Sequence, residues 1–323
     1  MLASVLRKMD MEKITCCGGG TIGAGFAYCF ARAGFSVYIL EVKQEAAENA
    51  LSRVSEICAS MQALGAETDA EAILSRITVG TDPGQAYAGA SLVQESGPEN
   101  LVIKRALLAT AEKYIPRSCL YASSTSSLSI SDIAANAAHP ERCFGAHPFN
   151  PVHLIPLVEL TKTDTGSEAV LSRATELYRR SGREPVVVNK ERPGFIANRI
   201  QHAVLREVIA MVTEGVCSLD DADRALVYGP GLRWGAIGQG LIGELASPEG
   251  AKAFNIAFRS ASERIFSDLS CMTRIPDSWP ELCAEGVERE KAQNPDFIGH
   301  TPEEIAEFRD RVLIELLKLH GKL

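Results

Sequence analysis

The sequence predicts two domains, an α/β domain with a mainly parallel sheet followed by an all-helical domain. The chain has 323 residues, about twice the ~150 residues of one typical domain. Short β-rich runs alternate with helix-like segments over the first part of the chain, as in βαβ units. The pattern changes at Pro193-Gly194, after which no convincing strand follows. We therefore predict domains at residues 1–192 and 193–323.

The predicted strands are short apolar runs without polar alternation, as expected for strands covered on both faces. They are Lys13–Cys17, Ser36–Glu41, Ile77–Gly80, Ser91–Glu95, Cys119–Ser123, Cys143–His147, Ile155–Leu160 and Pro185–Asn189. The helices predicted among them are Gly23–Ala33, Gln44–Ala63, Leu101–Tyr114 and Ser167–Ser181. The second domain is predicted to contain the helices Phe195–Thr213, Asp220–Val227, Gly250–Asp268, Pro280–Gln293 and Pro302–Leu319.

Composition excludes several classes of protein. With 46% hydrophobic and 23% charged residues, the chain has ample material for a core. No run approaches 18 apolar residues, and the first residues lack the apolar region and cleavage site of a signal peptide. A net charge of −8 argues against nucleic-acid binding. The nine cysteines show no metal-ligand spacing and indicate reduced thiols, so we expect a cytoplasmic protein without a metal site. Residues 1–11 receive no assignment beyond a lead segment before the first strand.

A glycine-rich segment joins the first strand to the first helix. It contains Gly18-x-Gly20-x-x-Gly23, and this strand–loop–helix context is the one that dinucleotide binding requires. Gly18 permits a tight turn, Gly20 allows a pyrophosphate to approach the backbone, and Gly23 allows the helix to pack on the strand. The helix N-terminus would then bind phosphate. The alternative is a purely structural turn.

The second strand ends in Glu41, 18 residues after Gly23. A carboxylate at this point binds the ribose hydroxyls of NAD and repels the 2′-phosphate of NADP. Lys43 is the only cation near it in the sequence. The sequence therefore predicts a Rossmann-type dinucleotide-binding domain that uses NAD.

His147 ends an apolar strand, and ligands of open parallel sheets bind beyond the carboxyl ends of strands. Twelve residues later, Glu159 stands in the apolar run Ile155-Pro-Leu-Val-Glu-Leu. A carboxylate there needs a partner, and a returning strand could bring it to His147. The pair would then form a general base with its orienting group. A structural histidine and a glutamate at a sheet edge are the alternatives, and His153 remains a second candidate base.

Two polar features accompany this pair. The segment Tyr121-Ala-Ser-Ser-Thr-Ser-Ser carries six hydroxyl groups at another strand end, which suits either a polar site or a helix cap at Ser127 or Ser129. Asn198 lies one turn into an apolar helix beside the domain boundary, where it is placed to face a cleft.

Five motifs together resemble the 3-hydroxyacyl-CoA dehydrogenase family, and they span nearly the whole chain in order. They are Gly18–Gly25, Ser124-Thr-Ser-Ser-Leu, His147-Pro-Phe-Asn-Pro-Val, Leu157-Val-Glu and Pro193-Gly-Phe-Ile-Ala-Asn-Arg. The motif Gly229-Pro-Gly-Leu-Arg-Trp-Gly-Ala-Ile-Gly resembles the branch that contains lambda-crystallin (L-gulonate 3-dehydrogenase) and carnitine dehydrogenase. The resemblance implies a 6-phosphogluconate-dehydrogenase-like helical domain and a homodimer formed through it.

The resemblance also implies roles for individual residues. His147 would be the general base, Glu159 would orient it, and Ser126 and Asn198 would hydrogen-bond the reacting oxygen. Asn150 would order the site and, with Ser126, contact the substrate. The cofactor would be contacted by the three loop glycines and by Thr21, Ile22, Glu41, Glu99, Lys104, Ser124 and Asn150. The family has Asn where this chain has Ser124.

The substrate is the remaining question. Residues 43–80 carry three cations against six anions, an acidic surface that would repel the phosphates of CoA. A free carboxylate needs a fork-shaped donor, and Arg233 could supply one from this subunit or from its partner. Trp234 is interpreted as a core residue, with contact to a quaternary ammonium as the alternative.

These observations predict an NAD-dependent enzyme that oxidises the 3-hydroxyl of a small L-3-hydroxy acid, similar to an L-gulonate 3-dehydrogenase. The alternatives are a 3-hydroxyacyl-CoA dehydrogenase, a carnitine 3-dehydrogenase and a non-catalytic NAD-binding protein. The presence of His147, Glu159, Ser126 and Asn198 favours an enzyme over the last of these.

Overall fold

The computed structural model describes residues 11–67 and 69–323 and divides into two units. Unit 1 contains the described residues up to Ile196 together with His320–Leu323, and unit 2 is Ala197–Leu319. The sequence analysis places the boundary at residue 192. The lead segment proposed for the start of the chain lies, except for Met11, outside the described residues.

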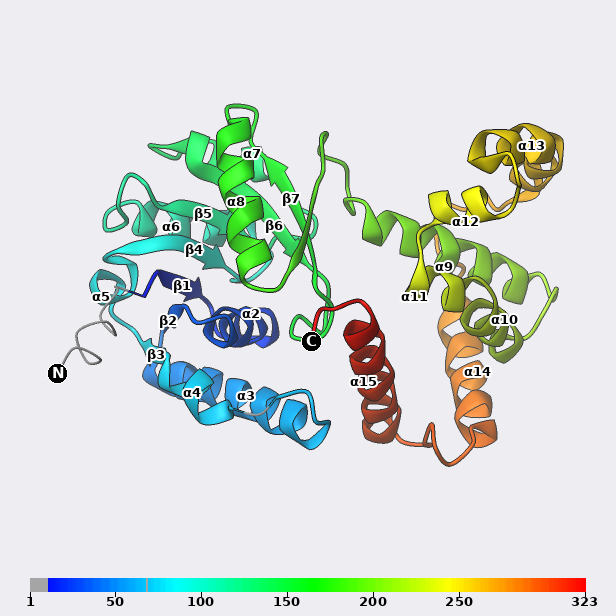
Figure 1. The fold of residues 1–323 in the computed structure, drawn as a ribbon, viewed down its shortest axis with the longest axis horizontal. Coiled ribbons are helices and arrows are strands. Elements are labelled where there is room, and N and C mark those ends of the chain that lie inside the picture. The colour runs from blue at the N-terminus through cyan, green and yellow to red at the C-terminus, as the bar shows by residue number, and fades with distance from the viewer. Residues whose placement is uncertain (1–10, 68) are drawn as a thin grey trace. The chain divides into compact units, whose positions relative to one another are not determined.

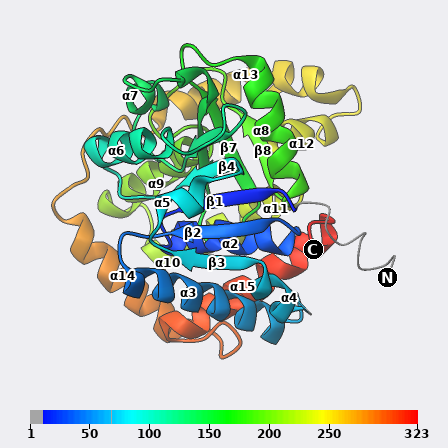
Figure 2. The same cartoon turned by 90° about the vertical axis from the view of Figure 1, so that its left-hand side faces the viewer.

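Unit 1 is built on an eight-stranded sheet with the order β3-β2-β1-β4-β5-β6-β7-β8. Neighbouring strands from β3 to β6 are parallel, β7 is antiparallel to β6, and β8 is parallel to β7. Figure 2 shows β1, β2 and β3 side by side. The strands are β1 Lys13–Cys17, β2 Ser36–Leu40, β3 Ile77–Gly80, β4 Ala90–Glu95, β5 Leu120–Ser123, β6 Cys143–Pro148, β7 Leu157–Lys162 and β8 Glu184–Val187. Each predicted strand is present, which confirms the Rossmann-type α/β domain.

Helices cover both faces of this sheet. The helices are α2 Thr21–Arg32, α3 Gln44–Ala63, α4 Ala70–Ser75, α5 Pro83–Tyr87, α6 Leu101–Ala111, α7 Ile130–Ala134, the 3₁₀ turn Pro140–Arg142 and α8 Glu168–Arg180. Rings from α2 and α8 meet on one face, where Phe26 and Phe30 contact Tyr178. On the other face, α5, α6 and α7 pack into one buried cluster with Val93 and Tyr121 of the sheet. The sheet core is therefore closed on both sides.

Unit 2 is all-helical, as predicted (Figure 1). Its helices are α9 Ala197–Thr213, α10 Leu219–Leu226, a π-helical turn Val227–Gly231, α11 Leu232–Ala236, α12 Gln239–Leu245, α13 Gly250–Asp268, α14 Trp279–Gln293 and α15 Pro302–Leu319. The predicted start of the first of these helices at Phe195 is wrong. Phe195 has φ 48°, in the left-handed region, so the helix begins two residues later.

The cysteines and helices allow two further statements. The nine cysteines are free thiols; the six in unit 1 are buried, whereas Cys217 and Cys283 are half-buried and Cys271 is exposed. Within residues 11–67 and 69–323, no helix has the length and apolarity needed to cross a bilayer.

Candidate active site

The strand order reverses between β1 and β4, and the glycine-rich loop lies at the carboxyl end of β1. In open α/β sheets such a reversal creates the crevice in which ligands bind. Gly18 has φ 97°, and a Cβ there would lie 2.9 Å from the carbonyl oxygen of Ser96, which follows β4. A Cβ on Gly23 would lie 1.9 Å from the Gly18 oxygen. Both positions therefore require glycine.

The N-terminus of α2 suits a pyrophosphate. Gly20 precedes α2, no side chain caps the helix, and a Cβ on Gly20 would meet no described atom within 4 Å. Thr21 is exposed and Ile22 half-buried in the first turn. Backbone amides at an open helix N-terminus bind phosphate, so the described residues fit a dinucleotide.

Glu41 stands at the end of β2, where the ribose of such a cofactor would lie. Its Oε1 accepts a hydrogen bond from Gly19 N at 2.6 Å, which fixes the carboxylate beside the loop. Sequence reasoning missed Arg53, whose Nη1 donates to Gly19 O at 3.2 Å. Lys43 is thus not the only cation near Glu41. Arg53 belongs to α3, and its spacing from the loop in the sequence gives no signal of this contact.

His147 and Glu159 are cross-strand partners on β6 and β7. His147 Nδ1 lies 2.9 Å from Glu159 Oε2, and the two residues are 6% and 0% exposed. Because β7 runs antiparallel to β6, the start of β7 lies at the carboxyl edge of the parallel strands. Glu159 Oε1 accepts from the amide of Ile196 at 2.7 Å. With Nδ1 hydrogen-bonded to a carboxylate, Nε2 is the nitrogen left to act as a base.

The other candidate base, His153, is not part of this pair. Its ring lies edge-on to Tyr28 of α2, with the centroids 6.3 Å apart. Asn150 is exposed and precedes a cis peptide bond to Pro151.

The hydroxyl-rich segment folds around Glu99. Glu99 Oε1 accepts hydrogen bonds from Thr125 Oγ1 at 2.7 Å, from Ser126 N at 3.0 Å and from Ser127 N at 2.8 Å. Burial opposes ionisation of Glu99, but the hydrogen bonds from Thr125 and Ser127 and the charge of Lys104 outweigh it and lower its pKa to about 2. Glu99 therefore fixes the loop that carries Ser126. Ser129 caps α7, as one of the sequence alternatives proposed.

Lys104 is 1% exposed, and its ammonium is held by protein carboxylates. Its Nζ lies 3.0 Å from Glu95 Oε1 and 3.5 Å from Glu99 Oε2. Glu95, which sequence reasoning missed, is fully buried and also accepts from Ser123 Oγ at 2.5 Å. The structure therefore shows Lys104 holding the two carboxylates behind the hydroxyl-rich loop, and its contact with a cofactor stays a prediction.

Ser124, which replaces the family's Asn, is held by a hydrogen-bond network. Its Oγ accepts from Gln94 Nε2 at 2.8 Å and lies 2.9 Å from Ser96 Oγ. Gln94 Oε1 in turn accepts from the hydroxyl of Tyr178. The serine side chain is therefore fixed although it is shorter than an asparagine.

Two predicted site residues, Asn198 and Arg233, belong to unit 2. Asn198 is the second residue of α9 and is half-buried. Arg233 is exposed on α11, and among the described residues no ion pair involves it. Trp234 beside it is 42% exposed and donates to Gln239 Oε1 at 3.0 Å, so its assignment to the core is wrong.

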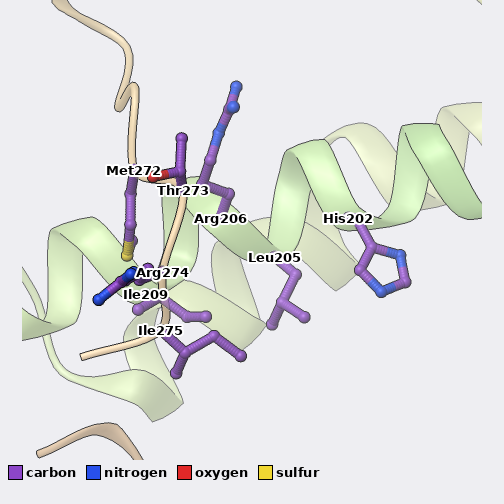
Figure 3. Close-up of a pocket in the computed structure, with 8 residues that line it drawn as sticks. All are labelled: His202, Leu205, Arg206, Ile209, Met272, Thr273, Arg274 and Ile275. Carbon is purple, nitrogen blue, oxygen red and sulfur yellow. The ribbon is translucent and has the colours of Figure 1, made fainter. Parts of the chain in front are cut away.

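A cavity of ≈ 150 Å³ lies in unit 2, along α9 and the segment Met272 to Ile275. Arg206 and Arg274 line it, but Figure 3 shows their guanidinium groups pointing in different directions. They therefore form no convergent anion site.

Comparisons with known proteins identify the family of this chain. The NAD-binding domain of 3-hydroxyacyl-CoA dehydrogenase matches residues 13–192, and the C-terminal domain of the same family matches residues 194–254. An L-carnitine dehydrogenase of Streptomyces coelicolor is 34% identical over 315 residues, covering 97% of this chain and 96% of the relative. Lambda-crystallin of Oryctolagus cuniculus is 32% identical over 312 residues, covering 95% of each chain.

A solved structure gives the same result. The NAD⁺-dependent 5-formyl-3-hydroxy-2-methylpyridine 4-carboxylic acid 5-dehydrogenase superimposes with a TM-score of 0.79 at 29% identity, over 96% of this chain and 98% of that one. The chain therefore belongs to the 3-hydroxyacyl-CoA dehydrogenase family.

Proposed function

We propose that this NAD-dependent oxidoreductase oxidises the 3-hydroxyl of a small free L-3-hydroxy acid to the 3-keto acid. The observation that carries the proposal is the buried pair of His147 and Glu159, with Nδ1 and Oε2 2.9 Å apart. A base with a neutral Nε2 and an orienting carboxylate is what removal of a hydroxyl proton requires.

In this mechanism, the hydroxyl proton passes to His147 Nε2 while the C3–H bond breaks and the C3=O bond forms. Bound NAD supplies the acceptor for the hydride. Glu159 stabilises the imidazolium that results, because its carboxylate lies against the opposite ring nitrogen. Ser126 and Asn198 would donate hydrogen bonds to the oxygen that becomes the carbonyl.

Three observations favour a free acid over a CoA ester. The exposed surface of α3 carries Glu45, Glu48 and Glu56, which repel phosphates. Arg233 is exposed and suits a carboxylate. The carnitine dehydrogenase relative and the pyridine carboxylic acid dehydrogenase both have names that specify free carboxylic acids.

Among free acids, we rank L-carnitine before L-gulonate as the expected substrate. The sequence analysis favoured L-gulonate. The carnitine dehydrogenase relative covers almost the whole chain. Trp234 is exposed next to Arg233, so one turn offers an aromatic face for a trimethylammonium group and a guanidinium for a carboxylate.

We further propose that the protein is a homodimer formed through unit 2. Large apolar side chains of unit 2 stay exposed, among them Phe258, Ile265 and Phe266 of α13. Apolar surface of this kind usually marks an interface.

The test is NAD⁺ reduction by the purified protein with L-carnitine, L-gulonate, L-3-hydroxybutyrate and 3-hydroxybutyryl-CoA, each repeated with NADP⁺. We expect one of the free acids to have the highest kcat/KM, with NAD⁺ preferred. A higher kcat/KM for the thioester would show that the acidic surface of α3 does not exclude CoA and would overturn the free-acid proposal.

A further inference from the structure

Phe195 lies against the imidazole of His147, although the sequence gives it no role beyond an apolar position in a helix. The two rings are stacked, with centroids 5.0 Å apart and planes at 23°. Phe149 meets the same imidazole edge-on at 6.1 Å. Phe195 is 6% exposed, so one face of the imidazole is shielded from water.

The backbone of Phe195 is unusual. A turn closes with Phe195 N donating to Arg192 O at 3.0 Å, and Gly194 within it has φ 80°. Pro193 followed by a glycine of positive φ is typical of a type II turn. Phe195 then has φ 48°, and among the described residues no other residue except glycine has a positive φ. An aromatic residue adopts this conformation rarely, and only where its surroundings hold it there.

The surroundings of Phe195 are the histidine and glutamate themselves. The ring stacks on His147, and the next amide, Ile196 N, donates to Glu159 Oε1 at 2.7 Å. Glu159 therefore uses one oxygen for the imidazole and the other for the backbone after Phe195. Ile196 is the last residue of unit 1 before α9 begins. The left-handed conformation of Phe195 thus lets one short segment contact both members of the pair.

We infer that Phe195 is a positioning residue of the reaction, which holds the His147 ring in the plane where Nδ1 meets Glu159 and Nε2 alone is left to the substrate. The inference rests on the proposed function of His147 as the base. The Phe195 ring restricts rotation of the imidazole and keeps water from its face. It also presents a π face to the imidazolium formed when the base takes its proton.

The carboxylate of Glu159 alone does not fix the orientation of the His147 ring. A single hydrogen bond at Nδ1 fixes one end of the ring but allows the imidazole to rotate about that contact. A stacked ring removes this freedom, and misplacement of a reacting group by about 1 Å can cost ~10²-fold in rate.

The experiment compares Phe195→Leu, which removes the ring, with Phe195→Tyr, which keeps it. Each variant is assayed for kcat with the panel substrate that the wild type oxidises best, and for NADH affinity. We expect Phe195→Leu to lose ~10-fold to ~100-fold in kcat with unchanged NADH affinity, and Phe195→Tyr to keep most of the activity. The matched control is Phe35→Leu, a phenylalanine that is 3% exposed just before β2, four strands away from β6 in the sheet.

A second measurement does not depend on substrate. The ¹⁵N signals of the His147 ring in labelled protein report which nitrogen carries the proton. We expect a single Nδ1–H tautomer in the wild type and in Phe195→Tyr, and a mixture of tautomers in Phe195→Leu. If Phe195→Leu fails to bind NADH, Phe195→Met replaces it in both measurements, because the flexible methionine side chain fills irregular gaps without an aromatic face.

The outcomes separate this inference from the proposed function. A wild-type kcat and a single tautomer in Phe195→Leu overturn the inference while leaving His147 as the base. Equal losses in Phe195→Leu and Phe195→Tyr also overturn it, because they indicate packing alone. If His147→Gln retains activity, the proposed function itself fails.

Discussion

The two units bury their helices very differently. In α2 of unit 1, nine of twelve residues are buried, whereas α13 of unit 2 has no buried residue among nineteen. Yet α13 is not polar, since Ile256, Phe258, Ile265 and Phe266 are 61%, 52%, 59% and 69% exposed. Unit 1 covers its apolar side chains with its own sheet, whereas unit 2 leaves many of its large apolar side chains exposed. We infer that unit 1 carries the base with its orienting carboxylate, and that unit 2 carries the surface for assembly.

The largest test of this division is His147→Gln. Because it removes the base but none of the exposed apolar surface, kcat should fall by ~10² to 10⁴-fold. NADH affinity and the mass in solution should stay the same. His139→Gln, before the amino end of β6, is the control and should be fully active. Activity of His147→Gln within about tenfold of wild type would remove His147 from the mechanism.

Phe266→Asp tests the role of unit 2 in assembly. A charge in place of a large exposed apolar side chain should weaken a dimer formed through this surface by ~2 kcal/mol or more, about thirtyfold in the dissociation constant. Light scattering should show the mass falling from about twice 34.8 kDa toward that of one chain. The control is Val102→Asp on α6, where the valine is 76% exposed in unit 1. A monomeric wild type would contradict the proposed homodimer.

Arg233→Lys tests whether unit 2 also contributes to substrate binding. Lysine keeps the charge but loses the paired donors that match a carboxylate, so KM for the free acid should rise about tenfold. NADH affinity and kcat should change little. Arg206→Lys, which alters an arginine of the cavity in Figure 3, is the control. An unchanged KM would exclude Arg233 from the site.

The smallest expected effect concerns the acid stability of unit 1. The pKa of Glu99 is lowered to about 2 from 4.5, so its ionised form stabilises the fold above about pH 4.5. That stability is lost as the pH falls from 4.5 toward 2. After a discount for a side chain that is 35% exposed, we expect a contribution of ~1 kcal/mol. Urea unfolding at pH 6 and pH 3 should show a smaller acid-induced loss in Glu99→Gln than in the wild type; an equal loss would contradict this origin.

The longer elements were predictable from sequence because their patterns are strong. The strands are apolar runs bounded by polar residues, and α3, α13 and α15 have the predicted bounds. By contrast, α4, α5 and α7 have only five or six residues, too few for a helical period to show. Phe195 fits the apolar period of the helix that follows it, so its left-handed backbone was not visible in the pattern.

The site was predictable where one residue needed a specific partner. Glu159 in an apolar strand indicated His147, and the register of β6 and β7 brings them together. The same argument applies to Glu95, whose partner Lys104 lies nine residues later. The sequence analysis interpreted the apolar run that ends in Glu95 only as a strand covered on both faces. Arg53 reaches the glycine loop from a different element, and sequence spacing alone does not show that contact.

The natural cysteines allow the two units to be followed separately without an engineered probe, because their thiols differ in exposure. Burial raises the pKa of Cys17 to about 12 and of Cys119 and Cys143 to about 12, so these thiols cannot react with an alkylating reagent while unit 1 is folded. The three cysteines of unit 2 are half-buried or exposed. A single alkylation time course, followed by mass spectrometry, would measure both units. The alkylation rates of the unit 2 cysteines would show whether a partner covers that surface, and those of the unit 1 cysteines would show only the unfolding of unit 1.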